Sequence, residues 1–202
     1  IAGGEGDDTL EIRARDIAVT FAGEGHVAGD TVQYRNGTVA GEWALTAANT
    51  GTLNSDVRFT GTEILSGGDG SDTLTGRNAP NAWVLAATGF TVDGVTFNAM
   101  ETLNGNADVD TFTINEAFTG QINGLGNDDV FNVSAAATIA GGEGDDTLEI
   151  RARDIAVTFA GEGHVAGDTV QYRQGTAAGE WALTAANTGT LNSDVRFTGT
   201  EI

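Results

Sequence analysis

The stretch IAGGEGDDTLEI occupies residues 1–12 and returns unchanged as residues 139–150. The match continues without a gap, because residues 1–64 recur as residues 139–202 with only two substitutions. Gln174 replaces Asn36, and Ala177 replaces Val39. An enzyme needs one well-formed site, whereas a chain that copies so long a segment almost unchanged is being lengthened. We therefore interpret residues 1–138 as one full repeat and residues 139–202 as the start of the next, in one continuous segment of a tandem array.

The charge balance of the chain restricts its partners. It has 29 acidic residues against nine basic ones, all of them Arg, and a formal net charge of −20. A surface that binds nucleic acid needs clustered positive charge, so we expect no nucleic acid partner, and cations or basic partners instead. Cysteine is absent, which excludes disulfide bonds. No apolar run approaches the roughly 20 residues of a membrane span, so we expect no membrane insertion.

A shorter period lies inside the long one. An Asp followed by Thr or Val and then an apolar residue recurs at seven positions, and the intervals that end at Asp72 and at Asp110 are about twice as long as the others. If each long interval contains one degenerate unit, every unit has about 17–22 residues and roughly seven units fill one repeat. The stretches SDVRF (Ser55–Phe59) and VDGVTF (Val92–Phe97) are the candidates for these degenerate units. The Asp residues of the pattern are Asp8, Asp30, Asp72, Asp110, Asp129, Asp146 and Asp168.

Each unit reads as strand, turn, strand and return. The Asp pattern ends in an apolar residue, and a second apolar residue lies nine positions before it. Leu103 thus precedes Phe112, and Ile122 precedes Phe131. Alternation in TFTI (Thr111–Ile114) buries one face of a strand, and stacked coils can enclose such faces. We predict an all-β right-handed parallel β-helix (β-solenoid), with the hand taken from the general crossover rule. Seven coils would make each repeat roughly 34 Å long.

Two other all-β folds compete with the β-helix. A Greek-key sandwich and a propeller are both built from short strands joined by turns. Neither fold requires the same Gly-Asp turn at every second strand, which a stack of similar coils does. The recurrence of the turn therefore favours the β-helix.

The second half of the long repeat resembles the first half. Trp83 aligns with Trp43, and Glu101 aligns with Glu63 at nearly the same offset. Paired carboxylates on a β-helix are also found in polysaccharide lyases and glycosidases. We favour the simpler interpretation, in which both glutamates hold equivalent positions on a polar face, and we expect no enzymatic activity.

The turns resemble the haemolysin-type (RTX) nonapeptide GGxGxDxUx, in which U is a large apolar residue. GGEGDDTLE (Gly3–Glu11), its copy at 141–149 and GGDGSDTLT (Gly67–Thr75) match every fixed position, whereas GNADVDTFT (Gly105–Thr113) and GLGNDDVFN (Gly124–Asn132) match in part. The resemblance implies Ca²⁺ bound between the turns of adjacent coils. Its candidate carboxylate ligands are Asp8, Asp72, Asp110, Asp129 and Asp146.

Physics supplies a separate reason for a cation at these turns, and also an alternative. Carboxylates about 5 Å apart on stacked coils repel by on the order of 3 kcal/mol per pair at an effective dielectric constant near 20. A hard divalent ion with oxygen ligands would offset this repulsion. Alternatively, each Asp accepts hydrogen bonds from turn N–H groups, and the glycines supply positive φ angles. Both interpretations remain open at the level of sequence.

Two other residue types have simple structural explanations. His26 and its copy His164 lie in GEGHVAG, without a second His or any Cys nearby, and are expected to be solvated loop residues. Trp43, Trp83 and Trp181 could stack on a carbohydrate, but each lies in a strand-like run, and we expect them to pack between coils.

The whole chain resembles the central repeats of very large bacterial surface adhesins of the filamentous-haemagglutinin-like and biofilm-matrix type. The long duplication, the GGxGxD turns and the related stretches FTGTEILSGG (Phe59–Gly68) and FNAMETLNGN (Phe97–Asn106) carry this resemblance. It implies a secreted, extracellular or cell-surface stalk that holds an adhesive region away from the cell. The partners would be neighbouring repeats, like molecules or extracellular polysaccharide. A self-associating matrix filament and a β-helix carbohydrate-active enzyme are the alternatives.

Overall fold

The structure is a computed structural model that describes residues 1–175 and 178–200. These residues form strands, turns and bends and contain no helix, so no helix among them could cross a membrane. The chain divides into two compact units. Unit 1 contains Ile1–Arg77 and Gly89–Leu103, and unit 2 contains Asn78–Thr88 and Asn104–Ile202. The predicted all-β class is confirmed.

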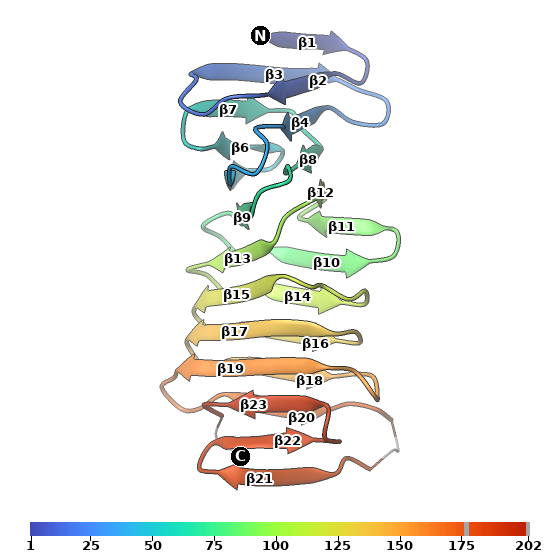
Figure 1. Cartoon of the computed structure of the whole chain (residues 1–202), viewed down its shortest axis with the longest axis vertical. Coiled ribbons are helices and arrows are strands. Elements are labelled where there is room, and N and C mark those ends of the chain that lie inside the picture. The colour runs from blue at the N-terminus through green and yellow to red at the C-terminus, as the bar shows by residue number, and fades with distance from the viewer. Residues whose placement is uncertain (176–177, 201–202) are drawn as a thin grey trace. The chain divides into compact units, whose positions relative to one another are not determined.

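Unit 1 has two sheets (Figure 1). In one sheet the order is β1-β3-β7-β6-β5-β9, and in the other it is β2-β4-β8-β12-β11. Pairs between successive turns of the chain are parallel, such as β2 with β4 and β3 with β7. The strands are β1 (Ala2–Glu5), β2 (Thr9–Ile12), β3 (Val19–Gly25), β4 (Thr31–Tyr34), β5 (Glu42–Ala47), β6 (Thr50–Leu53), β7 (Val57–Thr60), β8 (Ile64–Ser66), β9 (Thr73–Thr75), β11 (Gly89–Val92) and β12 (Val95–Asn98).

Unit 2 repeats this arrangement more regularly. One sheet has the order β15-β17-β19-β23-β22-β21 and the other has the order β10-β14-β16-β18-β20. From β14 to β20 the chain alternates between the two sheets, and each strand from β14 to β19 pairs in parallel with the strand one turn later. The strands are β10 (Ala82–Ala86), β14 (Thr111–Ile114), β15 (Gln121–Gly126), β16 (Val130–Val133), β17 (Ala137–Glu143), β18 (Thr147–Ile150), β19 (Val157–Gly163), β20 (Thr169–Tyr172), β21 (Trp181–Ala185), β22 (Thr188–Leu191) and β23 (Val195–Thr198). Strand β13 (Thr102–Asn106) contains one of the places where the chain passes between the units.

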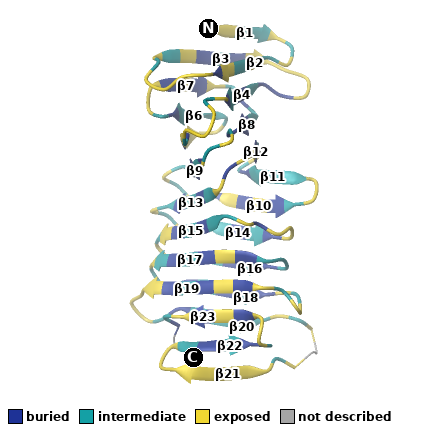
Figure 2. Cartoon of the chain, viewed as in Figure 1, coloured by how far each residue is buried: buried dark blue, intermediate teal, exposed yellow. Residues whose placement is uncertain are grey.

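The core consists of columns of like side chains. Alternate residues of each strand are buried, as the dark bands along β16 and β17 in Figure 2 show. In one column the rings of Trp83, Phe112 and Phe131 stack with centroids 5.3 and 5.1 Å apart. The residues predicted from the nine-residue offset are all buried, which confirms the two apolar columns: Leu103, Phe112, Ile122, Phe131, Ile139 and Leu148.

The prediction of uniform short coils is correct for part of the chain only. In unit 2, Phe112 pairs with Phe131 and Phe131 pairs with Leu148, so both coils have the predicted length. In unit 1, however, Val32 pairs with Leu65, and this coil is much longer than predicted. The extra residues form an antiparallel meander of β5, β6 and β7, which includes SDVRF, the first predicted degenerate coil. The second one, VDGVTF, lies in the antiparallel hairpin of β11 and β12.

The boundary between the two repeats lies inside a strand. Residues 138 and 139 are both in β17, which pairs in parallel with β15 on one side and β19 on the other. Ile139 therefore lies between Ile122, which belongs to the first repeat, and Phe159, which belongs to the second. No linker separates the repeats at this point.

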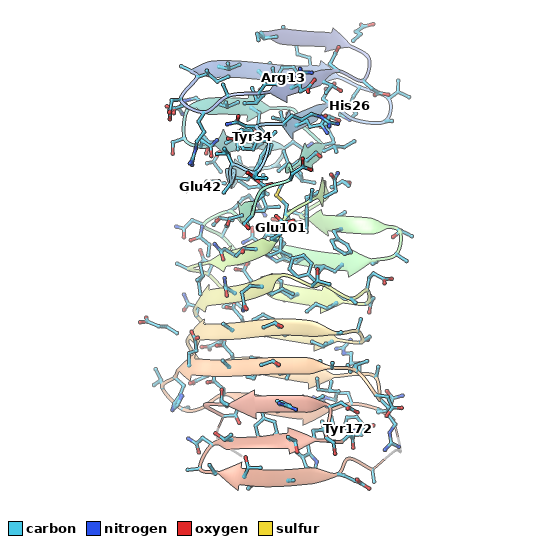
Figure 3. All side chains as sticks on the ribbon, in the orientation of Figure 1. Arg13, His26, Tyr34, Glu42, Glu101 and Tyr172 are labelled. Carbon is cyan, nitrogen blue, oxygen red and sulfur yellow. The ribbon has the colours of Figure 1, made fainter. Side chains whose placement is uncertain are left out.

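Equivalent residues of the two copies differ in burial. Tyr34, Trp43 and Leu45 are buried in unit 1, where β5 pairs with β9 and Trp43 lies opposite Leu74. Their copies are Tyr172, which is half-buried and is labelled with Tyr34 in Figure 3, and Trp181 and Leu183. Trp181 is 44% exposed and Leu183 is 64% exposed. In the described part of the chain, β21 pairs only with β22, so β21 lacks the neighbouring strand that β9 supplies to β5.

Candidate functional site

The predicted ligands lie at one recurring place in the fold. Each Asp is the last residue of a turn and directly precedes a strand, as Asp129 precedes β16 and Asp146 precedes β18. Most of these carboxylates are removed from solvent even though the turns lie at the surface. The fully or almost fully buried ones are Asp30, Asp72, Asp110, Asp129, Asp146 and Asp168.

A ladder of hydrogen bonds connects these turns from coil to coil. In unit 2, Oδ1 of Asp129 accepts a hydrogen bond of 2.7 Å from the backbone N–H of Asp110, and Oδ1 of Asp146 accepts one of 2.9 Å from that of Asp129. Asp168 accepts in the same way from Asp146. Parallel coils leave the N–H at this turn without a strand partner, and the carboxylate one coil later supplies one. The hydrogen-bonding alternative from the sequence is thereby observed, although the donor belongs to the neighbouring coil.

Two glutamates take the place of aspartate in unit 1. Oε2 of Glu63 accepts from the backbone N–H of Asp30 at 2.9 Å, and Oε2 of Glu101 accepts from that of Asp72 at 2.7 Å. These matching contacts agree with the proposed internal duplication. Both glutamates are thus members of the hydrogen-bond ladder, whereas the sequence predicted only equivalent positions on a polar face.

The first glycine of the nonapeptide is explained by close packing. A Cβ at Gly124 would contact Oδ2 of Asp129 and would lie 2.5 Å from the carbonyl oxygen of Gly141. The same relation joins Gly141 to Asp146 and Gly105 to Asp110. These three glycines have no positive φ angle, so the suggestion that all turn glycines supply positive φ is wrong for the first position. It holds for the later glycines of the turn, such as Gly142 and Gly144, with φ of 113° and 137°.

Burial changes the protonation of the ladder. Oδ2 of Asp129 and Oδ2 of Asp146 are buried and accept no hydrogen bond. Loss of hydration raises the pKa of Asp129 to about 8, and the adjacent carboxylates of Asp146 and Asp110 add to the rise. The pKa of Asp146 is raised to about 6 for the same main reason. At neutral pH a proton on Asp129 therefore removes part of the repulsion that a cation would otherwise have to offset.

A second carboxylate in the turn has a role that the sequence did not suggest. Oδ1 of Asp145 accepts hydrogen bonds from the backbone N–H groups of Val165, Ala166 and Gly167, at 2.9, 2.7 and 3.0 Å. These bonds lower the pKa of Asp145. Asp7 holds the equivalent loop of the first copy with the same three distances. In the pairs Asp7-Asp8 and Asp145-Asp146, the first carboxylate thus caps a loop and the second belongs to the ladder.

The donor atoms of the ladder fit a hard cation in their chemistry. Oδ2 of Asp129 and the carbonyl oxygen of Gly141 both lie beside Gly124, and both are oxygen donors of the kind that Ca²⁺ prefers. Asp8 and Asp72 lie in unit 1, and Asp110, Asp129 and Asp146 lie in unit 2. The structure thus places three of the five predicted ligands on successive coils.

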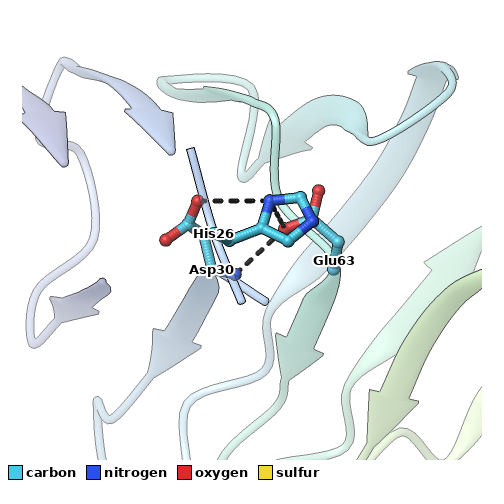
Figure 4. Close-up of side chains that lie close together, drawn as sticks. All are labelled: His26, Asp30 and Glu63. Atoms are coloured by element: carbon cyan, nitrogen blue, oxygen red, sulfur yellow. Dashed lines mark hydrogen bonds and ion pairs between the residues drawn. The ribbon is translucent and has the colours of Figure 1, made fainter. Parts of the chain in front are cut away.

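A different group of side chains converges most closely. Among the described residues, the one set of three potential metal ligands whose donor atoms all lie within 4.8 Å of one another consists of His26, Asp30 and Glu63 (Figure 4). His26 Nδ1 lies 3.3 Å from Oε2 of Glu63 and 4.0 Å from Oδ2 of Asp30. The prediction of a merely solvated histidine missed this group, because Glu63 is distant from His26 in sequence.

Two kinds of arrangement could therefore hold a cation. The ladder offers oxygen donors on stacked turns, and the group around His26 offers one imidazole nitrogen and two carboxylates.

Comparisons with family models, with curated proteins and with solved structures found no match to this chain.

Proposed function

We propose that the chain is a stalk or spacer segment from the repeat array of a large secreted bacterial adhesin, built as a parallel β-helix with antiparallel insertions. The position of the repeat boundary carries this proposal. A junction inside β17, paired on both sides, means that one repeat supplies the template for the next. A chain joined in this way becomes longer with each copy, and no new site is required.

The local contacts support the same interpretation. In unit 1 Phe21 of β3 pairs with Phe59 of β7, and in unit 2 their copies, Phe159 and Phe197, pair in the same register. The carboxylates that could suggest glycoside hydrolysis, Glu63 and Glu101, are held by backbone N–H groups of the ladder. We therefore propose a structural role and no enzymatic one.

We also propose that Ca²⁺ stabilises the stacked turns. Asp129 and Asp146 would hold the ion with Oδ2, together with the carbonyl oxygen of Gly141. The ion would supply positive charge where buried carboxylates approach one another. It would compete with the proton that Asp129 holds at neutral pH.

Small-angle scattering of proteins with one, two and three copies of the long repeat tests the stalk. We expect the maximum dimension to grow by a constant increment of roughly 30–40 Å per repeat, since neighbouring strands are about 4.8 Å apart. Light scattering on the same samples measures the molar mass. A mass that rises with concentration would favour the self-associating filament instead, and dimensions of separate globular domains would rule out a continuous stack.

A further inference from the structure

We infer that His26, Asp30 and Glu63 form a binding site for a divalent transition-metal ion such as Zn²⁺, through Nδ1, Oδ2 and Oε2 respectively. The site goes beyond the proposed stalk function, and it uses none of the carboxylates that the turn motif suggests as Ca²⁺ ligands. All three residues belong to unit 1. His26 comes from the loop after β3, Asp30 from the residue before β4, and Glu63 from the residue before β8 (Figure 4).

The buried carboxylate of Asp30 points to a ligand. Asp30 is fully buried, and its Oδ1 accepts a hydrogen bond of 2.7 Å from the backbone N–H of Asp8. Its Oδ2 is buried without any hydrogen-bond partner and faces the His26 ring. A buried carboxylate oxygen without a donor destabilises the folded state unless a cation or a proton satisfies it. The neighbouring coil already satisfies one oxygen of Asp30, and the second is left for a cation.

The second carboxylate is held in place by its surroundings. Oε1 of Glu63 accepts a hydrogen bond of 2.7 Å from Nδ2 of Asn49, and Oε2 accepts one of 2.9 Å from the backbone N–H of Asp30. Such outer contacts orient metal ligands and strengthen binding. Gly29 leaves the space that Glu63 needs, because a Cβ at Gly29 would lie 3.0 Å from Cβ of Glu63.

The geometry and the donor types favour a transition metal over Ca²⁺. Zn²⁺ bonds of about 2.0–2.2 Å in a tetrahedron place neighbouring ligand atoms roughly 3.3 Å apart. His26 Nδ1 and Glu63 Oε2 are 3.3 Å apart, and small side-chain rotations would bring the 4.0 Å distance to Asp30 Oδ2 into the same range. Imidazole is a common ligand of Zn²⁺ and a poor one for Ca²⁺ or Mg²⁺. The His26 side chain is 37% exposed, so an ion can enter from solvent.

The duplication repeats the His and Asp of this arrangement in the described residues. In unit 2, Nδ1 of His164 lies 3.6 Å from Oδ2 of Asp168. Glu201 is the copy of Glu63 and lies outside the described residues. An array would thus carry one such site in every long repeat.

Zn²⁺ titration by calorimetry tests the site. A His164→Ala chain isolates the first copy, and we expect it to bind one high-affinity Zn²⁺. Adding His26→Ala or Glu63→Gln to this chain should weaken that binding by more than the roughly 10–100-fold that the loss of an outer contact costs. Glu24→Gln is the matched control, because it removes an exposed carboxylate at the end of β3, two residues before His26, and should leave the affinity unchanged.

Two results would overturn the inference. One is an equal Zn²⁺ affinity of the His164→Ala chain with and without His26. The other is an equal loss of affinity in the Glu24→Gln control, which would indicate attraction by net charge only. Circular dichroism of every variant verifies folding, and Glu63→Gln, which nearly preserves side-chain shape, gives an answer if His26→Ala perturbs the loop. Neither result would affect the stalk proposal, which depends on the scattering experiment.

Discussion

At the scale of single residues, the first glycine of the turn is the most sensitive position. We expect Gly124→Ala to lower the free energy of unfolding by about 1–3 kcal/mol or more, because the added methyl group would overlap Oδ2 of Asp129 and the carbonyl oxygen of Gly141. Gly126→Ala is the matched control in the same turn. The atom nearest to a Cβ there is 3.7 Å away, so the control should be neutral or up to about 1 kcal/mol more stable. Urea titrations measure both changes, and equal losses would contradict the packing explanation.

The raised pKa of Asp129 predicts how the stability of the folded state depends on pH. Its pKa is about 8 in the folded state and about 3.9 in an unfolded chain, so the folded state binds more protons between these values. The contribution of Asp129 to stability is therefore complete below about pH 4 and is lost as the pH rises toward 8. We expect Asp129→Asn to remove this loss, which is on the order of 1.4 kcal/mol per pH unit within the window.

Unfolding measured at pH 5, 6, 7 and 8 gives the slope for both chains. Glu143→Gln is the control, because it removes an exposed carboxylate of the same unit and should keep the slope of the original chain. Asn81 is an asparagine that already occupies a ladder position. Its backbone N–H donates to Oδ1 of Asp110, as the backbone N–H groups of the ladder aspartates donate along unit 2. A slope that Asp129→Asn leaves unchanged would mean that Asp129 is ionised in the folded state.

The sequence predicted contacts that depend on local spacing along the chain and missed contacts between residues that are distant along the chain. The Gly-Asp turns and the buried column of Phe112 and Phe131 follow from local spacing, and the structure contains both. The group of His26, Asp30 and Glu63 could not be predicted, because its distances depend on how much chain is inserted between two turns. The length of that insertion became clear only from the strand pairing.

At the scale of strands and coils, the stacked turns predict a response to calcium. If Ca²⁺ binds Oδ2 of Asp129 and Asp146, millimolar Ca²⁺ should raise the melting temperature by mass action. The rise should be larger at pH 8 than at pH 6, because the ion must displace the proton of Asp129. Mg²⁺ should have much less effect, since it requires tight octahedral geometry. Asp146→Asn should reduce the rise in melting temperature, whereas His26→Ala should leave it unchanged. A melting curve insensitive to Ca²⁺ and to chelators would contradict the calcium proposal and leave hydrogen bonds and protonation as the stabilisation of the turns.

The irregular coils show the limit of prediction at this scale. The strands of the β5-β6-β7 meander alternate apolar and polar residues as parallel strands do, and side-chain alternation does not distinguish the two pairings. Tight turns decide the difference. Asn49 and Asn54 have positive φ angles of 51° and 50° and close the two antiparallel connections. Short connections around such residues, instead of the interval between Asp signals, were the feature that could have indicated a meander.

At the scale of the whole molecule, the exposed face of β21 predicts how the array continues. Trp181 is 44% exposed, whereas its copy Trp43 is 1% exposed in β5, beside β9, the strand that contains Leu74. We expect a chain lengthened after residue 202 by the sequence of residues 65–77 to place a new strand beside β21. Burial of Trp181 should then shift its fluorescence to shorter wavelength, and the apolar area removed from water should raise the melting temperature.

A second lengthened chain carries Trp181→Phe. Subtracting its fluorescence spectrum from that of the lengthened chain leaves the signal of Trp181 and removes the signal of the other two tryptophans, which are buried. Lengthening by the same residues in scrambled order is the control for added mass. If repeats stack as one continuous template, only the native order restores burial, because Leu74 must meet the tryptophan in the register that β5 and β9 show. An unchanged fluorescence of Trp181 in the native-order chain would mean that the edge of one repeat does not direct the folding of the next, and the stalk proposal would then lose its structural basis.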